Sequence, residues 1–115
     1  RKAKKVNLST NPCRIRLYTQ EVVVFREDLT TKFKKNLLFP PKISNEDGTM
    51  SFSDHMIKSV CDQCHLCPFP FNKKPIRYEF DSSLRLYPLP DVLILADQAN
   101  FYQKKYKNEL IVLNP

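Results

Sequence analysis

The sequence predicts a mixed α/β fold in which five or six strands pack on two helices. Short segments with alternating or continuous apolar residues, typical of strands, are interspersed with two stretches whose apolar residues recur every four positions, as in helices. The length of 115 residues suits one small domain or a piece of a larger one, and 42% hydrophobic residues argue against a disordered chain. We therefore expect a sheet and helices that share one core.

The first two expected strands form a hairpin. Residues 14–18 alternate polar and apolar side chains, which indicates a half-buried strand. Residues 21–25 are almost continuously apolar and rich in valine, which indicates a more buried strand. Thr19 and Gln20 lie between the two segments and predict the turn.

The first expected helix covers residues 29–38. Asp28 is placed to cap it, and one face carries apolar side chains at Leu29, Phe33 and Leu37. Two prolines directly after it would end it. Residues 42–50 show no periodicity, so we expect an exposed loop there.

The second expected helix covers residues 52–64. Ser51 and Asp54 fit a capping box, in which each side chain bonds the backbone N–H of the other residue. An apolar stripe recurs every four positions, at Phe52, Met56, Val60 and Cys64. Such a stripe predicts that one side of this helix faces the core.

Three further strands are expected in the second half of the chain. Residues 76–80 alternate apolar and charged side chains, and Leu84 and Leu86 continue the pattern after a break. Residues 92–96 are all apolar and flanked by aspartates, which is typical of a strand buried on both faces. Residues 110–113 form the last apolar run.

Three cysteines at two-residue spacing form the clearest local motif. Cys61, Cys64 and Cys67 with His65 resemble half of a zinc site, because this spacing lets two sulfurs reach one tetrahedral ion. The other half is missing, since no second spaced pair of Cys or His exists. The expected helix also places these thiols on its apolar stripe, which favours burial as packing residues. A structural zinc site remains the alternative, and disulfides are not expected.

Other chemistry has weaker support in the sequence. Gly48 is the single glycine, which excludes a phosphate-binding loop and a dinucleotide fingerprint. His55 and one of the helix cysteines could be imagined as a nucleophile pair, although a surface histidine is the simpler interpretation. Asp97 follows the buried strand, where α/β folds bind ligands, but it has no neighbouring ligands in sequence. We expect no cofactor and no catalytic residues.

The net charge of +7 is concentrated at the amino end. Residues 1–10 form a basic arm that could contact phosphates through Arg1, Lys2, Lys4 and Lys5. A solvated flexible end is the interpretation we favour. No uncharged stretch approaches the roughly 18 residues of a membrane-spanning helix, so no membrane partner is expected.

Two long tracts of the sequence are specific enough to compare with known families. They are Thr-Gln-Glu-Val-Val-Val-Phe-Arg-Glu-Asp at residues 19–28 and Leu-Tyr-Pro-Leu-Pro-Asp-Val-Leu-Ile-Leu-Ala-Asp at residues 86–97. Both tracts resemble the B subunits of DNA polymerase epsilon. The resemblance extends from about Asn11 to Pro115. The family form carries Gly before the histidine at position 65, where this chain has Cys64.

The resemblance implies both a fold and a role. Residues 11–115 would be the C-terminal part of an inactivated calcineurin-like phosphoesterase domain, whose first half and OB-fold lie upstream. Active relatives of that domain carry histidine motifs in the later strands, whereas the buried strand here ends in Asp97-Gln98. The resemblance therefore implies a nuclear, non-catalytic scaffold in DNA replication that holds the C-terminal region of the catalytic subunit and contacts DNA through the complex.

Two other functions stay open as alternatives: a small zinc-binding nucleic-acid module and a metal-dependent phosphoesterase. The scaffold interpretation predicts an exposed apolar patch and self-association of this piece through open strand edges. One candidate partner surface is the proline-rich step at Tyr87, Pro88, Leu89 and Pro90. A rigid strand entry would explain the same residues.

Overall fold

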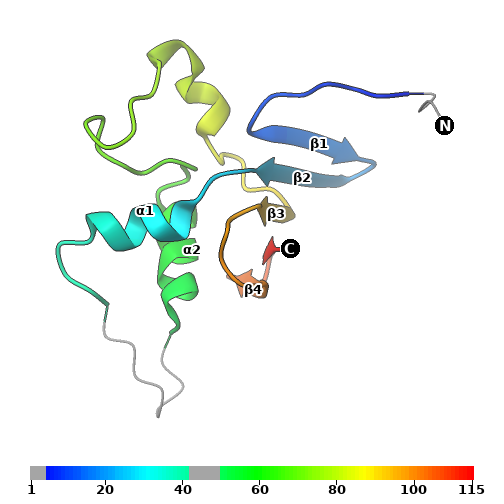
Figure 1. Cartoon of the computed structure of the whole chain (residues 1–115). Helices are drawn as coiled ribbons and strands as arrows, with labels where there is room; N and C mark the ends of the chain where they lie inside the picture. Colours follow the sequence, from blue (N-terminus) through cyan, green and yellow to red (C-terminus); the bar gives the residue numbers. More distant parts are fainter. Residues whose placement is uncertain (1–4, 42–49) are drawn as a thin grey trace.

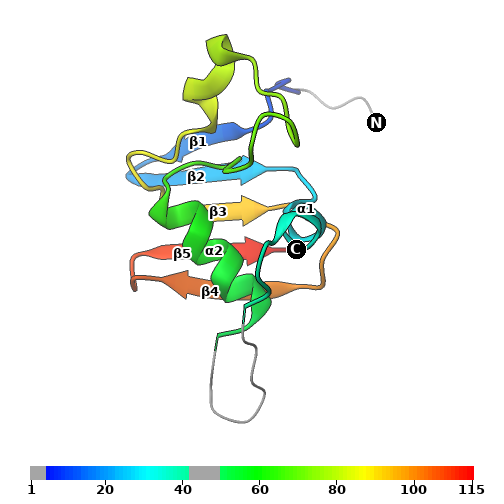
Figure 2. The ribbon, with the colours of Figure 1, turned by 90° about the vertical axis from the view of Figure 1, so that its left-hand side faces the viewer.

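A five-stranded mixed sheet carries two α-helices on one face in the computed structural model, which describes residues 5–41 and 50–115 (Figure 1; Figure 2). The strand order is β1-β2-β3-β5-β4, with parallel pairs in the centre and an antiparallel pair at each edge. The expected mixed α/β fold is confirmed. The elements are β1 (Cys13–Leu17), β2 (Gln20–Phe25), α1 (Leu29–Asn36), α2 (Phe52–Asp62), the 3-10 helix η1 (Tyr78–Leu84), β3 (Val92–Leu95), β4 (Tyr102–Tyr106) and β5 (Leu110–Asn114).

Both helices begin where their caps predict. The Asp28 side chain accepts a hydrogen bond from the backbone N–H of Thr31 at the start of α1. Ser51 and Asp54 form the complete capping box of α2. These caps satisfy N–H groups that have no partner inside a helix, so the start of each helix is fixed by local sequence.

One face of the sheet and the inner sides of both helices form the core. Paired strand residues point to the same face, and the central row on this side runs Val23, Leu93, Val112. Leu29 of α1 and a stripe of four residues on α2 are buried against that face: Met56, Ile57, Val60 and Cys61. We call this side the helix face.

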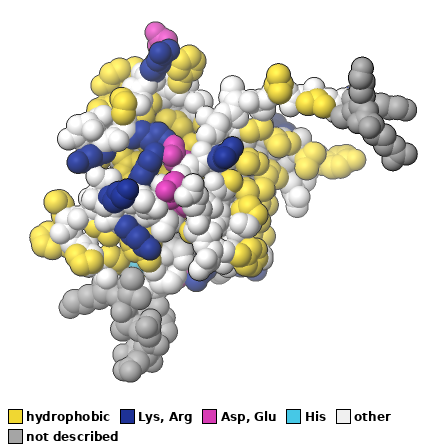
Figure 3. Space-filling model, in the orientation of Figure 1, with side chains coloured by type: hydrophobic (Ala, Val, Ile, Leu, Met, Phe, Trp, Pro, Cys, Tyr) yellow, Lys and Arg dark blue, Asp and Glu magenta, His cyan; other side chains and the backbone are white. Residues whose placement is uncertain are grey.

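The opposite side, which we call the open face, is also apolar. Two rows cross the sheet there: Ile15, Val22, Val92 and Ile111 in one, and Cys13, Val24, Ile94 and Leu113 in the other. Most of these side chains are half-buried by their neighbours, and no element in the described part of the chain covers them. Figure 3 shows hydrophobic side chains along the flank that faces away from the helices. The expected two-sided burial of β3 is therefore wrong, because residues 5–41 and 50–115 place helices on one face of the sheet only.

The strand expected at residues 76–80 is also wrong. This region forms η1, and its aromatic side chains Tyr78 and Phe80 point into solvent. An alternating pattern forms a strand only where a neighbouring strand offers hydrogen bonds, and here a single bridge joins Arg85 to His65.

The structure adds one strand that the periodicity did not indicate. β4 is an edge strand whose outer row carries Gln103 and Lys105, while Tyr106 turns to the core. Lysines protect an edge strand from pairing with other chains, so Lys104 and Lys105 are compatible with a strand here.

Several expectations concern residues outside the described ranges. The candidate phosphate contacts Arg1, Lys2 and Lys4, and most of the loop expected at residues 42–50, fall there; Lys5 is described and exposed. Within the described ranges no helix is long and apolar enough to cross a membrane.

Candidate functional site

The cysteine motif lies partly inside the core. Cys61 and Cys67 are buried, and Cys64 is half-buried with its thiol directed to the carbonyl of Cys61 at 3.3 Å. Burial raises the pKa of Cys61 to about 12 and raises that of Cys67 as well. Burial thus disfavours the charged thiolate, which is the form that attacks a substrate or binds zinc. Among the described residues, no three His, Cys, Asp or Glu side chains group as metal ligands.

His65 is held by hydrogen bonds from both ring nitrogens. Its Nδ1 accepts from the backbone N–H of Cys67 at 3.0 Å, so Nε2 carries the proton and faces Asp81 at 3.2 Å. Asp81 also accepts two hydrogen bonds from Arg85, and these contacts, with that of His65, lower its pKa. His65 thus joins the end of α2 to η1.

His55 lies in the first turn of α2 and is half-buried. Of its two candidate partners, Cys61 is buried and Cys64 is half-buried. No hydrogen bond among the described residues joins the His55 ring to either thiol, so the structure does not bring the nucleophile pair together.

Asp97 lies at the carboxyl edge of the parallel strands, as the sequence indicated. Its Oδ2 accepts from the backbone N–H and the hydroxyl of Thr30, at 2.8 and 2.7 Å. Its other oxygen and the hydroxyl of Tyr102 are buried without a hydrogen-bond partner in the described structure. Burial, followed by the charge of Asp97, raises the pKa of Tyr102 to about 12. An open pocket of about 570 Å³ lined by Thr30 and Tyr102, among others, lies beside this cluster.

Asn114 is a residue of this edge that sequence reasoning missed. It is fully buried and accepts a hydrogen bond from the backbone N–H of Asp97 at 2.9 Å. Its amide donates to the carbonyls of Ala99 and Asn100, at 2.9 and 3.3 Å. The signal available in the sequence was a polar residue at the end of an apolar strand. If such a residue is buried, it needs hydrogen-bond partners, so its position indicated a buried polar contact.

The proline-rich step lies on the surface beside the hairpin. Tyr87 is 81% exposed and Leu89 38%, Pro88 is exposed, and Pro90 is buried. Arg14 of β1 donates to the backbone carbonyls of Arg85 and Pro88, at 3.0 and 3.4 Å. The exposed aromatic ring is therefore presented on a segment that is hydrogen-bonded to the sheet.

The geometry describes an α/β domain in which both ring nitrogens of His65 are engaged in internal hydrogen bonds and one oxygen of Asp97 is not, and whose surface offers an apolar face. A family model for the DNA polymerase alpha/epsilon B subunit matches residues 1–103. The chain belongs to this family, which confirms the resemblance found in the sequence.

Named relatives come from animals, plants and fungi. DNA polymerase epsilon subunit 2 of Bos taurus is 40% identical over 107 residues, covering 93% of this chain and 19% of that protein. The DNA polymerase epsilon B subunit of Arabidopsis thaliana is 40% identical over 91 residues, covering 79% of this chain and 17% of that protein. The corresponding B subunit of Saccharomyces cerevisiae is 30% identical over 141 aligned residues, covering 97% of this chain and 20% of that protein. The chain spans about a fifth of the length of these relatives.

Proposed function

We propose that this chain acts in a non-catalytic accessory subunit of the replicative DNA polymerase epsilon complex, in the nucleus. The observation that carries the proposal is the match to the family of polymerase B subunits along most of the chain. In this role the protein binds the C-terminal region of the catalytic subunit and other subunits, and it reaches DNA through the complex.

We propose further that residues 1–10 are a basic arm and that residues 11–115 are the C-terminal part of an inactive phosphoesterase-like domain. The open face supports the second part of this proposal, because its two apolar rows resemble the inner face of a sandwich of two layers. The chain spans about a fifth of its relatives, so the upstream part of the same polypeptide is the occupant we assign to this face.

The polar contacts of His65 support the absence of catalysis. Both of its ring nitrogens are engaged with Cys67 and Asp81, whereas a phosphoesterase needs its histidines free to bind its ions. Asp97 gives no such support, because only one of its oxygens is held by Thr30. The zinc-module alternative would need Cys61 and Cys67 as thiolates, which their burial disfavours.

The proline-rich step is the partner surface that we propose for the catalytic subunit. Tyr87 and Leu89 offer exposed apolar area on a segment tied to Arg14, and aromatic side chains on fixed segments are frequent anchors of interfaces.

The test is binding between the full-length protein that contains this chain and the C-terminal region of the catalytic subunit. We expect a complex by size-exclusion chromatography with light scattering, and a loss of affinity of about tenfold in Tyr87→Ala/Leu89→Ala. Phe39→Ala, which also removes an exposed apolar side chain, is the matched control and should bind normally. Absence of a complex with the unchanged protein would refute the scaffold role.

A second assay addresses the two alternatives. The full-length protein, purified without chelator or a histidine tag, is analysed for metal by mass spectrometry and incubated with manganese and a phosphodiester. We expect neither bound zinc nor hydrolysis above background. One zinc per chain that is lost in Cys61→Ser/Cys64→Ser would establish the zinc module, and hydrolysis lost in Asp97→Asn would establish the phosphoesterase.

A further inference from the structure

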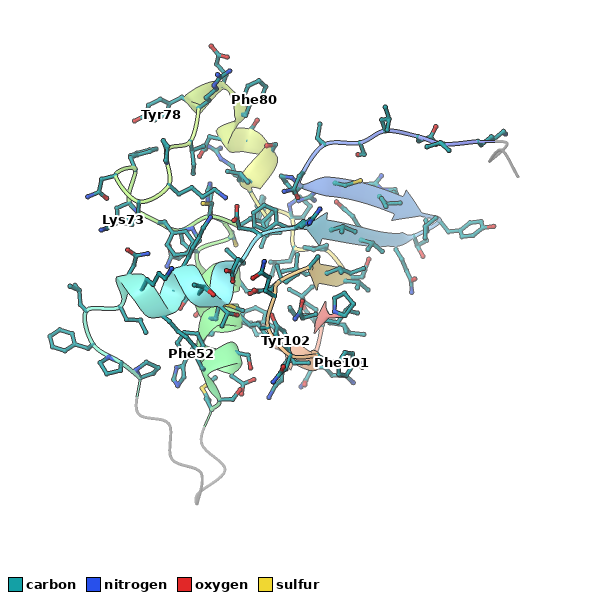
Figure 4. All side chains as sticks on the ribbon, in the orientation of Figure 1. Phe52, Lys73, Tyr78, Phe80, Phe101 and Tyr102 are labelled. Carbon is teal, nitrogen blue, oxygen red and sulfur yellow. The ribbon has the colours of Figure 1, made fainter. Side chains whose placement is uncertain are left out.

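A second exposed apolar surface lies away from the open face, on η1 and the segment before it. Phe71, Tyr78 and Phe80 are 55%, 80% and 58% exposed, and the rings of Phe71 and Tyr78 pack at 5.3 Å between centroids. We call these three residues, with Lys73 and Arg77, the aromatic knob. Figure 1 and Figure 2 both place η1 beyond the β1 edge of the sheet, and Figure 4 shows Tyr78 and Phe80 on this projection.

The aromatic knob is braced against the body of the protein. At its end, Asp81 of η1 bonds His65 and Arg85, and the backbone N–H of Leu66 donates to Leu84 at 2.8 Å. At its start, Lys74 forms an ion pair with Glu27. A projection fixed at both ends loses little conformational freedom on binding, so its exposed rings can contribute most of their contact energy.

Phe69 adds an apolar brace just before the knob. Its ring packs on that of Phe33 in α1, with the centroids 4.9 Å apart and the planes tilted by 60°. The rings of the knob itself have no such partner from the described helices α1 and α2. The fold therefore half-buries Phe69 at the base of the projection and exposes the aromatic residues at its tip.

The charge of the knob selects among possible partners. Lys73 and Arg77 are exposed and form no ion pair with any described residue, whereas Glu79 is the only acidic residue among positions 71–80. Lys74 is already paired with Glu27. The remaining charges on the knob are two positive ones, on Lys73 and Arg77, and one negative one, on Glu79. An acidic partner gains attraction here, and tyrosine and arginine are the residue types that dominate binding energy at interfaces.

We propose that the aromatic knob binds an acidic segment with apolar side chains on another subunit of the polymerase complex. This inference rests on the proposed accessory role and adds an interface separate from the proline-rich step. Single-stranded DNA is the less favoured occupant. Glu79, between Tyr78 and Phe80, repels the phosphates of DNA. The knob also projects from the surface, whereas proteins usually bind single strands in grooves lined with cations.

The first experiment measures affinity of the full-length protein for the other purified subunits of the complex. We expect Tyr78→Ala/Phe80→Ala to weaken binding about tenfold or more, and Arg77→Glu to weaken it by a smaller factor that shrinks at high salt. Phe101→Ala is the matched control, since Phe101 is 72% exposed elsewhere on the surface. Thermal unfolding of each variant should match that of the unchanged protein, because the altered side chains are exposed.

The second experiment places a photo-crosslinking phenylalanine analogue at position 78 in the assembled complex. A cross-link to an Asp- or Glu-rich segment of another subunit supports the proposal. A cross-link within the same polypeptide, or to a single-stranded oligonucleotide, overturns it. If the complex forms and Tyr78→Ala/Phe80→Ala binds normally, the knob proposal fails and the accessory role stands. If the unchanged protein binds no polymerase subunit, both fail.

Discussion

The two faces of the sheet carry similar side chains in different surroundings. In β3, Leu93 and Leu95 are 0% and 1% exposed beneath the helices, whereas Val92 and Ile94 are only half-buried on the open face. A sheet with one solvated face usually alternates apolar and polar residues. The apolar open face therefore suits a structure with a layer on each side of this strand, of which the described residues supply one.

The largest effect should come from truncating the helix face. Leu93→Ala leaves a cavity in the core and should cost about 2–5 kcal/mol of unfolding free energy in the 115-residue chain, measured by urea denaturation. Ile94→Ala, one position along and on the open face, should cost about 1 kcal/mol, because its side chain loses less burial.

The same pair of variants can break the comparison. In the full-length protein, Ile94→Ala should become about as costly as Leu93→Ala if an upstream layer covers the open face. If Ile94→Ala has the same small effect on the unfolding free energy in the 115-residue chain and in the full-length protein, nothing in the polypeptide covers this face.

Thiol reactivity should also separate the faces. Cys61 is a buried residue of α2 on the helix face, and burial raises its pKa to about 12. Cys13 is half-buried on the open face. At about pH 8 the folded chain should alkylate Cys61 at least about 100-fold more slowly than the urea-unfolded chain does. Mass spectrometry after timed iodoacetamide treatment gives both rates, with Cys13 as the internal comparison. Fast labelling of Cys61 in the folded chain would contradict its place in the core.

The helix face could be predicted from the sequence because its signals are local. Asp28, Ser51 and Asp54 fix the helix starts, and the four-residue repeat of α2 identifies its buried stripe. The core residues follow once strands and helices are placed, because the side chains on one face of a helix or of a strand recur at a fixed spacing in the sequence.

The fold of residues 76–80 and the contacts of Asn114 could not be predicted, because both depend on neighbours that lie far away in sequence. Residues 76–80 alternate like a strand, but strand formation needs a partner edge, and the chain forms η1 there. Asn114 gains its role only when β5 brings it beside Asp97 and the loop of Ala99. No local pattern reports such pairings, which is why the carboxyl edge was predicted by position but not by its contacts.

Self-association offers a smaller effect that sharpens the comparison. The 115-residue chain should associate through the open face in sedimentation velocity experiments, since exposed apolar patches favour contacts between copies. Ile111→Lys places a charge beside Lys105 on that face and should weaken association about tenfold. The control Lys58→Ala, on an exposed position of α2, should leave association unchanged. Association that survives Ile111→Lys would point to the strand edges instead.

The smallest effect concerns the cap that holds α2 over the helix face. Partial burial pushes the pKa of Asp54 upward, but hydrogen bonds from Ser51 and Lys104 outweigh it and hold the pKa below its ordinary value of 3.8. A carboxyl group whose pKa is lower in the folded state stabilises the fold at pH values above its pKa in the unfolded state. This contribution is lost as the pH falls through its pKa in the folded state. We expect Asp54→Asn to flatten the decline of stability below about pH 4 by no more than about 1 kcal/mol, measured by thermal unfolding against pH. Ile94→Ala should leave the dependence of stability on pH unchanged, because Ile94 is on the opposite face of the sheet and does not contact the Asp54 carboxylate. An unchanged slope in Asp54→Asn would assign the acid sensitivity to Asp28 and Asp81, whose pKa values are also lowered.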